Sequence, residues 1–543
     1  MACGVPRVKC SGPRARVDRS FHASVRSCRQ TKRYSRCEEQ ALDTAYLLRR
    51  AAASYPDVTA VDDGVSARSF SALIHRAERL ANALDALGVA EGASVGILSD
   101  NRTEFVEADC AVALGRRVRV ALNARLHLDD FRHVAQDADL RVLLFSRRFA
   151  DAAHALAAEF GLLAVPFDPD PDFAHSFESL VESAPAEPRR RDGDPEAASW
   201  IIYTSGTTGR PKGVVLSHRA IREVALNLLL ELGPVRTGER ILLTQAISHA
   251  SGYFVLPYLI SGAGVHLMPR FDPDEVWRRS RQECFRTLKA VPAMLEPLLD
   301  AADGEWGFET IVYGASSVAL PVLDRALDRF GPTLIQDYGQ SEAPMTITCL
   351  GKDDHLDPDA RRSAGRPWRS VAVEVRDEHG AIAAPGEIGE VHVRGSHMMT
   401  GYHRNPEATA AVLVDGWLRT KDLALTDERG FVHLQGRSDE MINSGGYNIA
   451  PREVENVLSA HAAVSEAVVL GMPDPRWGDA VTAVVRLRGP QSVSSEELID
   501  FVRPRLGIRT PRRLEVWDSI PRTAYGKVDR VELRKQLANG GPS

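Results

Sequence analysis

A run of glycine and hydroxyl residues that ends in a lysine occupies positions 203–213 and could bind phosphate. It reads Tyr203, Thr204, Ser205, Gly206, Thr207, Thr208, Gly209, Arg210, Pro211, Lys212, Gly213. Glycines let the backbone approach an oxyanion closely, hydroxyl and N–H groups donate to its oxygens, and the lysine adds a positive charge. A Gly/Ser/Thr stretch alone is more often a flexible linker. Only eight of the 67 basic residues are lysines, so a lysine within this ordered run favours a phosphate loop. The loop is not a Walker A loop, because no Gly-Lys-Ser/Thr ends it.

A second motif places an aromatic ring, a hydroxyl and a carboxylate close together. It reads Gln336, Asp337, Tyr338, Gly339, Gln340, Ser341, Glu342. A nucleobase needs a flat surface to pack against, and a hard cation that bridges phosphate oxygens needs a carboxylate. Tyr-Gly and Ser-Glu pairs also occur commonly in turns and helix caps, so this motif alone does not decide between the two interpretations.

Four further blocks complete the series. They are Gly-Ala-Ser at 314–316, Trp-Leu-Arg-Thr-Lys-Asp at 417–422, a long block at 436–455 with a Gly-Gly pair, and a block at 521–530 that contains a lysine. In order and content the six blocks resemble the adenylate-forming superfamily, which includes acyl-CoA synthetases, aryl-CoA ligases, adenylation domains of peptide synthetases and luciferases. The resemblance is closest to the acyl- and aryl-CoA ligases. It covers the chain from Ala41 to the C-terminus.

The resemblance implies a nucleotide site. In the family, the phosphate loop binds ATP, a backbone cradle and an aromatic ring hold adenine, a hydroxyl residue touches the α-phosphate, and an aspartate and an arginine bind the ribose. By position, these ATP- and AMP-binding roles fall on Thr204, Ser205, Gly206, Thr207, Thr208, Gly209, Lys212, Gly314, Ala315, Ser316, Asp337, Tyr338, Gly339, Ser341, Asp422 and Arg437. Glu342 is the implied Mg²⁺ ligand. The family usually has glycine where this chain has Lys421, and a solvent-facing side chain would make that change harmless.

The resemblance also implies a two-step reaction with ATP, Mg²⁺ and coenzyme A. The catalytic residues are Lys527, Glu342 and Thr204. A mobile lysine ammonium neutralises the charge that builds up as the carboxylate attacks the α-phosphate. The C-terminal part then rotates about a hinge at Asp439, and the strand with Gly445 and Gly446 lines the thiol tunnel. A surface lysine in a loop is the ordinary reading of Lys527, but its place in the full series outweighs it.

The acid substrate is less well defined. His249 stands where the family has a residue that gates the acyl pocket, although a lone histidine is often only a core residue. With Tyr253, Tyr313 and Gly339 it would form a mostly apolar pocket. Amino-acid adenylation domains carry an aspartate in this stretch, and residues 243–256 contain none. We therefore expect an aryl or medium-chain fatty acid.

Three functions stay open at this point. A coenzyme A ligase leads. The second is a stand-alone adenylating enzyme that loads the phosphopantetheine of a carrier protein, and the third is an inactive ATP-binding module. The combination of Glu342, Asp422 and Lys527 argues against the third.

The elements that position these residues follow an α/β pattern. Helices are expected at 69–87, 102–114 and 128–137, and strands at 94–98, 117–121, 141–145, 199–203, 214–216 and 310–313. Residues 167–196 have the composition of a surface linker, and short β segments begin at Val371. The prediction is an α/β multi-domain protein: a basic N-terminal extension (1–37), a large domain with a β-rich subdomain (38–436), a hinge (437–439) and a small mobile α+β domain (440–543).

Composition narrows the class of protein. A content of 44% hydrophobic and 26% charged residues is typical of a globular protein. The basic residues of 1–37 precede an acidic remainder, which gives no basic surface for nucleic acid. That extension is open to interpretation as a transit peptide, a disordered tail or a misassigned start. No apolar run is long enough to span a membrane, and the scattered cysteines indicate a reducing compartment, so we expect a cytoplasmic enzyme.

Overall fold

The first large sheet is mostly parallel, and helices alternate with its strands along the chain. The structure is a computed structural model, and it describes residues 43–189, 193–204, 211–302, 304–316, 318–489, 493–523 and 528–541. This first sheet has the strand order β18-β8-β7-β4-β3-β5-β6. Its strands are β3 (Ser94–Leu98), β4 (Val118–Ala121), β5 (Leu140–Phe145), β6 (Leu163–Pro166), β7 (Ala198–Thr204), β8 (Lys212–Ser217) and β18 (Gly401–Tyr402). Strands β3 to β7 run parallel, whereas β8 and β18 are antiparallel.

Helices cover both faces of this sheet because alternate strand residues are apolar on each side. Val142 and Leu144 pack in the core that also holds α2 (Phe70–Ala86), α3 (Thr103–Leu114) and α6 (Phe177–Ser183). Leu143 and Phe145 point the other way, toward α4 (Leu128–Asp137), η1 (Arg147–Phe149) and α5 (Ala150–Phe160).

A second sheet has the order β15-β14-β13-β12-β11-β9-β10-β1-β2. Its strands are β1 (Thr59–Asp62), β2 (Ala67–Ser69), β9 (Arg240–Leu243), β10 (Gly264–Leu267), β11 (Phe285–Ala290), β12 (Thr310–Gly314), β13 (Leu334–Gln340), β14 (Ala343–Leu350) and β15 (Arg366–Pro367). One face packs against α1 (Thr44–Ser54), α7 (His218–Leu232), η2 (Ala250–Phe254) and α8 (Val255–Ile260). The other packs against α9 (Pro273–Ser280), α10 (Pro292–Asp300) and α11 (Leu320–Phe330).

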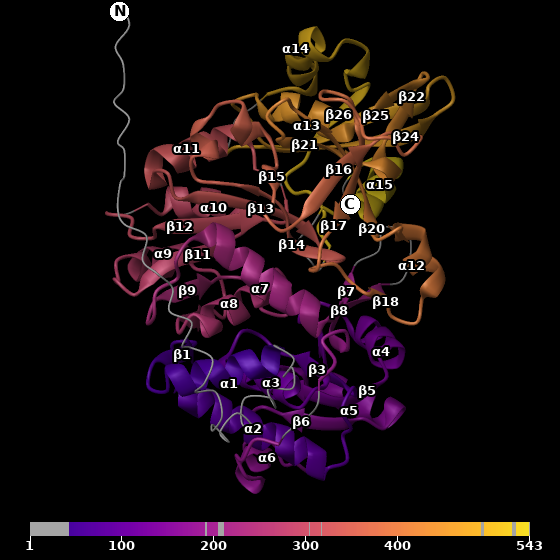
Figure 1. Cartoon of the computed structure of the whole chain (residues 1–543). Helices are drawn as coiled ribbons and strands as arrows, with labels where there is room; N and C mark the ends of the chain where they lie inside the picture. Colours follow the sequence, from indigo (N-terminus) through magenta and orange to yellow (C-terminus); the bar gives the residue numbers. More distant parts are fainter. Residues whose placement is uncertain are drawn as a thin grey trace, which may run out of the picture. The chain divides into compact units, whose positions relative to one another are not determined.

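The two sheets share one core. Val95 of β3 and Ile241 of β9 belong to the same buried cluster, together with residues of α2 and α7. In Figure 1, helix α7 crosses the middle of the view, with β13 and β14 above it and β3, β5 and β6 below it. Helices between two sheets are therefore buried on two sides, and the C-terminal edges of both sheets border the loops that carry the predicted site.

A smaller antiparallel sheet follows from Val371 onward, as expected. It contains β16 (Ala372–Arg376), β17 (Gly389–Arg394), β19 (Leu413–Val414), β20 (Trp417–Thr426) and β21 (Val432–Arg437), with α12 (Pro406–Val412) beside it. Two short turns of 3₁₀ helix precede it, η3 (Asp354–Leu356) and η4 (Ala360–Arg362).

The last hundred residues form an α+β arrangement. Strands β22 (Ile442–Ser444), β23 (Tyr447–Ile449), β24 (Val464–Asp474), β25 (Gly478–Leu487) and β26 (Arg513–Val516) make one sheet. Helices α13 (Pro451–Ser459) and α14 (Ser495–Leu506) pack on one face, and α15 (Arg530–Ala538) packs on the other. The turn η5 (Ser438–Glu440) precedes β22, and the turn η6 (Gly507–Arg509) connects α14 to β26. The predicted α/β class, with a β-rich part and a small α+β C-terminal part, is confirmed.

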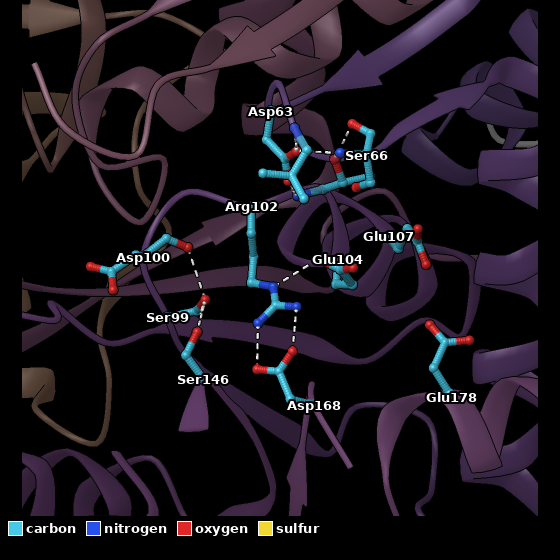
Figure 2. Close-up of polar contacts among 12 residues, drawn as sticks. Asp63, Ser66, Ser99, Asp100, Arg102, Glu104, Glu107, Ser146, Asp168 and Glu178 are labelled. Carbon is cyan, nitrogen blue, oxygen red and sulfur yellow. Dashed lines mark hydrogen bonds and ion pairs between the residues drawn. The ribbon is translucent and has the colours of Figure 1, made fainter. Parts of the chain in front are cut away.

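The loop after β3 is braced by polar contacts. Arg102 donates to Glu104 at 2.7 Å and makes two parallel bonds to Asp168 at 2.8 and 2.9 Å (Figure 2). The bonds from Arg102 lower the pKa of Asp168 below its ordinary value. On the other side of the loop, the hydroxyls of Ser99 and Ser146 lie 2.5 Å apart. The backbone around residue 101 is therefore fixed on both sides.

No helix in the described part of the chain is both long and apolar enough to cross a membrane. The cysteines in the same part, Cys110, Cys284 and Cys349, are free thiols.

Candidate active site

The carboxylate of Glu342 lies in the turn between β13 and β14 and is held by a tyrosine. The hydroxyl of Tyr402 donates to Glu342 Oε1 at 2.7 Å. Tyr402 belongs to β18, the short strand that pairs with β8. Burial, and then the negative charge of Glu342, raise the pKa of Tyr402 well above its ordinary value of about 10, so the hydroxyl stays a donor.

The same tyrosine also contacts the phosphate loop. The Lys212 ammonium lies 5.2 Å from the centroid of the Tyr402 ring, a cation–π contact. Thr204 and Lys212 are register partners in β7 and β8, so the two ends of the loop lie side by side. Ser205, Gly206, Thr207, Thr208 and Gly209 lie outside the described residues. Glu342, Lys212 and Tyr402 thus form one cluster beside the predicted phosphate loop.

A second cluster contains the residues predicted to hold the nucleoside. Tyr338 donates its hydroxyl to Asp422 Oδ2 at 2.6 Å. Arg437 lies 3.4 Å from the other oxygen of Asp422 and 3.5 Å from Asp439. Burial and the neighbouring Asp422 raise the pKa of Tyr338 well above its ordinary value. The structure therefore brings together Tyr338, Asp422 and Arg437, which come from three different strands.

The predicted adenine cradle begins where β12 ends. A Cβ atom on Gly314 would collide with the carboxylate of Asp337, which explains glycine at this position. Ala315 has a φ of +70°, a left-handed conformation that costs an L-residue energy. Ala315 and Ser316 are exposed. The backbone of this turn is thus available to a ligand.

The Asp337 carboxylate lies beside Gly314 and is buried in an ion pair. Its side chain is 2% exposed, and its Oδ2 lies 2.6 Å from the Lys289 ammonium of β11. Burial raises the pKa of Asp337, and the charge of Lys289 opposes that shift. A contact between Asp337 and the nucleotide stays a prediction. Gly339 and Ser341 lie half-buried in the same β13–β14 hairpin, between Tyr338 and Glu342.

The predicted acid-binding segment lies between β9 and α8. His249 contacts the hydroxyl of Ser248 through Nδ1 at 2.7 Å. Tyr253 packs its ring 5.1 Å from that of Trp200, and its buried hydroxyl has no hydrogen-bond partner within the described residues. Burial raises the pKa of Tyr253 far above the ordinary value.

Asn101 in the loop after β3 and Arg119 in β4 hold this segment by its backbone. The Asn101 side chain donates to the carbonyls of Gln245 and Met268 at 2.8 and 2.9 Å and accepts from the N–H of Ile247 at 2.9 Å. The buried Arg119 donates to the Ile247 carbonyl at 2.8 Å. The position of His249 is thereby coupled to the braced loop after β3.

Tyr313 packs in a different core from Tyr253, and its place in the acid pocket stays a prediction. Side chains alternate along β12, so Val312 packs in the core that contains Tyr253 while Tyr313 packs in the core beneath α9–α11. The Tyr313 hydroxyl is 2.9 Å from His355 Nε2 and donates to Gln336 Oε1 at 3.1 Å. Tyr313 is therefore a core residue.

The hinge and tunnel residues occupy turns. Asp439 lies in η5. Gly445 and Gly446 have φ values of +61° and +82° in the β22–β23 turn. A Cβ atom on Gly445 would approach the Trp477 ring to 2.8 Å, whereas Gly446 has open space around it. Hinge motion and a thiol tunnel stay predictions.

Lys421 adopts the backbone conformation of a glycine. Its φ is +63°, its side chain is exposed, and its N–H donates to Glu390 Oε1 at 3.0 Å. Lysine in place of the family's glycine therefore keeps the irregular backbone of β20 next to Asp422, at the cost of backbone strain at residue 421.

Lys527 lies outside the described residues. The chain ends on either side of it are close, because Arg522 and Val528 form a β-bridge and the N–H of Asp529 donates to the Pro521 carbonyl at 2.9 Å.

Four residues of these clusters were not predicted from the sequence: Tyr402, Lys289, Asn101 and Arg119. Lys289 could have been noticed from the sequence, because it is one of the few lysines and stands in an apolar strand. Tyr402 and Asn101 could not have been, because their partners are more than 50 residues away.

The chain belongs to the AMP-binding enzyme family. The model described as "AMP-binding enzyme" matches residues 48–403, and "AMP-binding enzyme C-terminal domain" matches residues 453–527.

Two curated relatives and one solved structure are similar over most of their length. The medium/long-chain-fatty-acid–CoA ligase FadD8 of Mycobacterium tuberculosis is 37% identical, over 86% of this chain and 85% of the relative. A feruloyl-CoA synthase of an Amycolatopsis species is 35% identical, over 90% and 98%. The o-succinylbenzoate CoA synthetase of Bacillus subtilis, solved with its acyl-adenylate intermediate, superposes with a TM-score of 0.80 at 29% identity, over 90% and 97%.

Proposed function

We propose that this protein is an AMP-forming acid–CoA ligase that works in two steps. An acid and ATP give acyl-AMP and pyrophosphate, and acyl-AMP and coenzyme A then give the thioester and AMP. The observation that carries the proposal is the convergence of two clusters on the turn after β13: Glu342 with Tyr402 and Lys212, and Tyr338 with Asp422 and Arg437. One cluster suits phosphates and the other suits a nucleoside.

In the first step, an oxygen of the acid attacks the α-phosphorus and the bond to pyrophosphate breaks. Negative charge builds up on the phosphate oxygens, and preorganised cations stabilise it. Lys212 and Lys527 supply the positive charge in our assignment, and Thr204 with the loop after it supplies donors. Tyr338, Asp422 and Arg437 hold the nucleoside, so the α-phosphate is presented to the acid near His249.

The residues present fit Mg²⁺ that arrives with ATP. No group of three or more His, Cys, Asp or Glu side chains suited to a metal occurs among the described residues. Mg²⁺ commonly takes one or two protein carboxylates and completes its shell with phosphate oxygens and water. Glu342 is such a carboxylate, and bound Mg²⁺ would neutralise phosphate charge.

In the second step the thiol replaces AMP at the carboxyl carbon. One fixed arrangement hardly serves both steps, so we assign a rotation of the C-terminal part about Asp439, which withdraws Lys527 and brings the Gly445–Gly446 turn to the thiol path. The sulfur forms the thioester bond as the bond to AMP breaks, AMP leaves with the electron pair of that bond, and the thiol proton passes to solvent.

The relatives support the two acid classes expected from the sequence. One is named for medium- and long-chain fatty acids and the other for an aromatic acid, ferulate. We propose an aryl or medium-chain fatty acid, coenzyme A as acceptor, and a cytoplasmic location. A carrier protein is the alternative acceptor.

The test assays the half-reactions separately on two variants. Lys527→Ala should lose acyl-AMP formation and still convert supplied acyl-AMP to thioester. Asp439→Pro fixes φ near about −65°, so it should keep pyrophosphate release and lose thioester formation. If both variants lost the same half-reaction, the alternation and the role of Asp439 would be wrong. Parallel assays with coenzyme A and a phosphopantetheinylated carrier protein decide the acceptor.

A further inference from the structure

Lys289 places a buried ammonium at the edge of the second sheet where ligands bind. In open parallel sheets, ligands bind outside the carboxyl ends of the strands. Lys289 is the second-last residue of β11, and Gly314 is the last of the parallel neighbour β12. The side chains of Lys289 and Asp337 are each 2% exposed. A charged pair therefore lies buried at the binding edge.

The pair reaches across a neighbouring strand. Lys289 is in register with Val312, and Asp337 with Gly314, so the ammonium must cross β12 to meet the carboxylate. Because Gly314 has no side chain, the space that a Cβ atom would fill is taken by Asp337. The pair consequently lies directly beside the exposed turn at Ala315 and Ser316.

On its other side the ammonium borders the acid-binding segment. Lys289 Nζ lies 5.0 Å from the centroid of the Phe254 ring, and Phe254 follows Tyr253 in η2. The Lys289 carbonyl accepts the hydroxyl of Thr244 at 2.8 Å, at the start of the segment that carries His249. Lys289 thus lies between the segment that binds the acid and the turn that binds the nucleotide.

The pair is poorly explained as a stabilising contact. Removing two charges from water costs about as much as their attraction returns, and an apolar pair of similar size often serves equally well. An ammonium has three donor hydrogens. Within the described residues, Lys289 uses its ammonium in one hydrogen bond, to Asp337. Donor capacity remains for a ligand.

We propose that Lys289 is a specificity residue of the acid-binding site: its ammonium, oriented by Asp337, donates a hydrogen bond to a neutral oxygen on the acid substrate, apart from the reacting carboxyl group. The inference rests on the proposed function and names the substrate class more closely, as acids that carry a hydroxyl, ether or keto oxygen. Asp337 already balances the charge, so a second carboxylate on the substrate is disfavoured. A plain hydrocarbon tail leaves the buried donor unpaired, which costs binding.

The experiment compares matched acids on matched variants. Lys289→Met combined with Asp337→Asn removes the pair without leaving a lone buried charge. Lys352→Met is the control, because Lys352 donates to the Glu309 carbonyl at 2.7 Å, before β12 begins. Pyrophosphate release gives kcat/KM for 3-phenylpropanoate against 3-(4-hydroxyphenyl)propanoate and for decanoate against 10-hydroxydecanoate. The wild type and the control should prefer the oxygenated acid of at least one pair by about 10-fold or more. The double variant should lose that preference, which is a ratio between two acids and does not depend on any change that Asp337→Asn makes to ATP binding.

Several results would overturn the inference. One is a wild type without preference for any oxygenated acid, and another is a double variant that slows both members of each pair equally. If the double variant does not fold, Lys289→Arg decides, because it keeps the ion pair and moves the donor; an unchanged preference ratio would then refute the proposal. A wild type that releases no pyrophosphate with any acid would overturn the proposed function and this inference with it.

Discussion

The Tyr402 hydroxyl donates to Glu342, so a residue of the β18 edge strand orients the carboxylate assigned to Mg²⁺. This contact joins two segments that lie 60 residues apart in the sequence. A change at Glu342 tests the charge of the carboxylate, and a change at Tyr402 tests its orientation. Comparing the two variants therefore separates the two effects.

Glu342→Gln keeps the size of the side chain and removes its charge. Acyl-AMP formation should fall by about 10²-fold or more, because the phosphate-bound cation loses its protein carboxylate. Rates measured across a Mg²⁺ titration test this prediction. An unchanged kcat/KM for ATP at limiting Mg²⁺ would remove Glu342 from the site.

Tyr402→Phe removes only the hydroxyl that orients Glu342. We expect kcat/KM for ATP to fall by about 10-fold, less than for Glu342→Gln, because a hydrogen bond to a charged group contributes roughly 1.5–3 kcal/mol. Isothermal titration of MgATP provides a second readout. A loss as large as that of Glu342→Gln would mean that Tyr402 touches the reacting groups directly.

Lys421→Gly should stabilise the protein. The residue has a φ of +63°, a conformation that costs an L-residue roughly 1–2 kcal/mol, and part of that gain is offset by the greater freedom of glycine in the unfolded chain. The free energy of unfolding should rise by about 1 kcal/mol, measured by urea denaturation. Lys421→Ala is the matched control and should give no gain, since alanine keeps the strain.

Asn101→Ala should loosen the acid-binding segment. It deletes three hydrogen bonds to the backbone at 245, 247 and 268, with an expected loss of about 2–3 kcal/mol of stability. The KM for the acid should rise more than the KM for ATP. Equal changes in both KM values would show that Asn101 stabilises the fold without positioning His249.

His397 should make the protein sensitive to acid. Burial, and then the charge of Arg219, lower the pKa of this fully buried imidazole to about 4. The unfolded chain takes up the proton near pH 6.5, so between about pH 6.5 and 4 the unfolded state binds more protons. The free energy of unfolding therefore falls as the pH falls through this window, by roughly 3 kcal/mol. His397→Leu should reduce that slope, measured by urea denaturation across this pH range.

Local patterns predicted most of the elements, because they depend on neighbouring residues. The strand expected at 94–98 and the helix at 128–137 match β3 and α4, and Ser69 caps α2 as its position indicated. The linker expected at 167–196 contains helix α6, which begins at a capping box on Ser176 within a segment rich in prolines and acids. Strand β10 lies in an apolar run, and such a run alone does not distinguish a strand from a helix.

The candidate site was predictable where a residue's own chemistry marks it, as for the contact of Tyr338 with Asp422, and the ligand roles of both residues stay predictions. It was not predictable where two ordinary residues meet across the fold. Asn101 and Ile247 are 146 positions apart, and the sequence around neither residue predicts their contact. The burial of Tyr313 beneath α9–α11 was not predictable for a related reason, because the face to which a strand residue points depends on the sheet around it.

Strand β18 has a consequence for the folding of the chain. Until residues 401 and 402 have been synthesised, the apolar strand β8 has no partner on its outer side, and an unpaired strand edge is a template for association with other chains. Pairing over such a distance is also slow, because a long loop must close first. Nascent or truncated chains that end before Gly401 should therefore aggregate more readily than chains that extend past Tyr402.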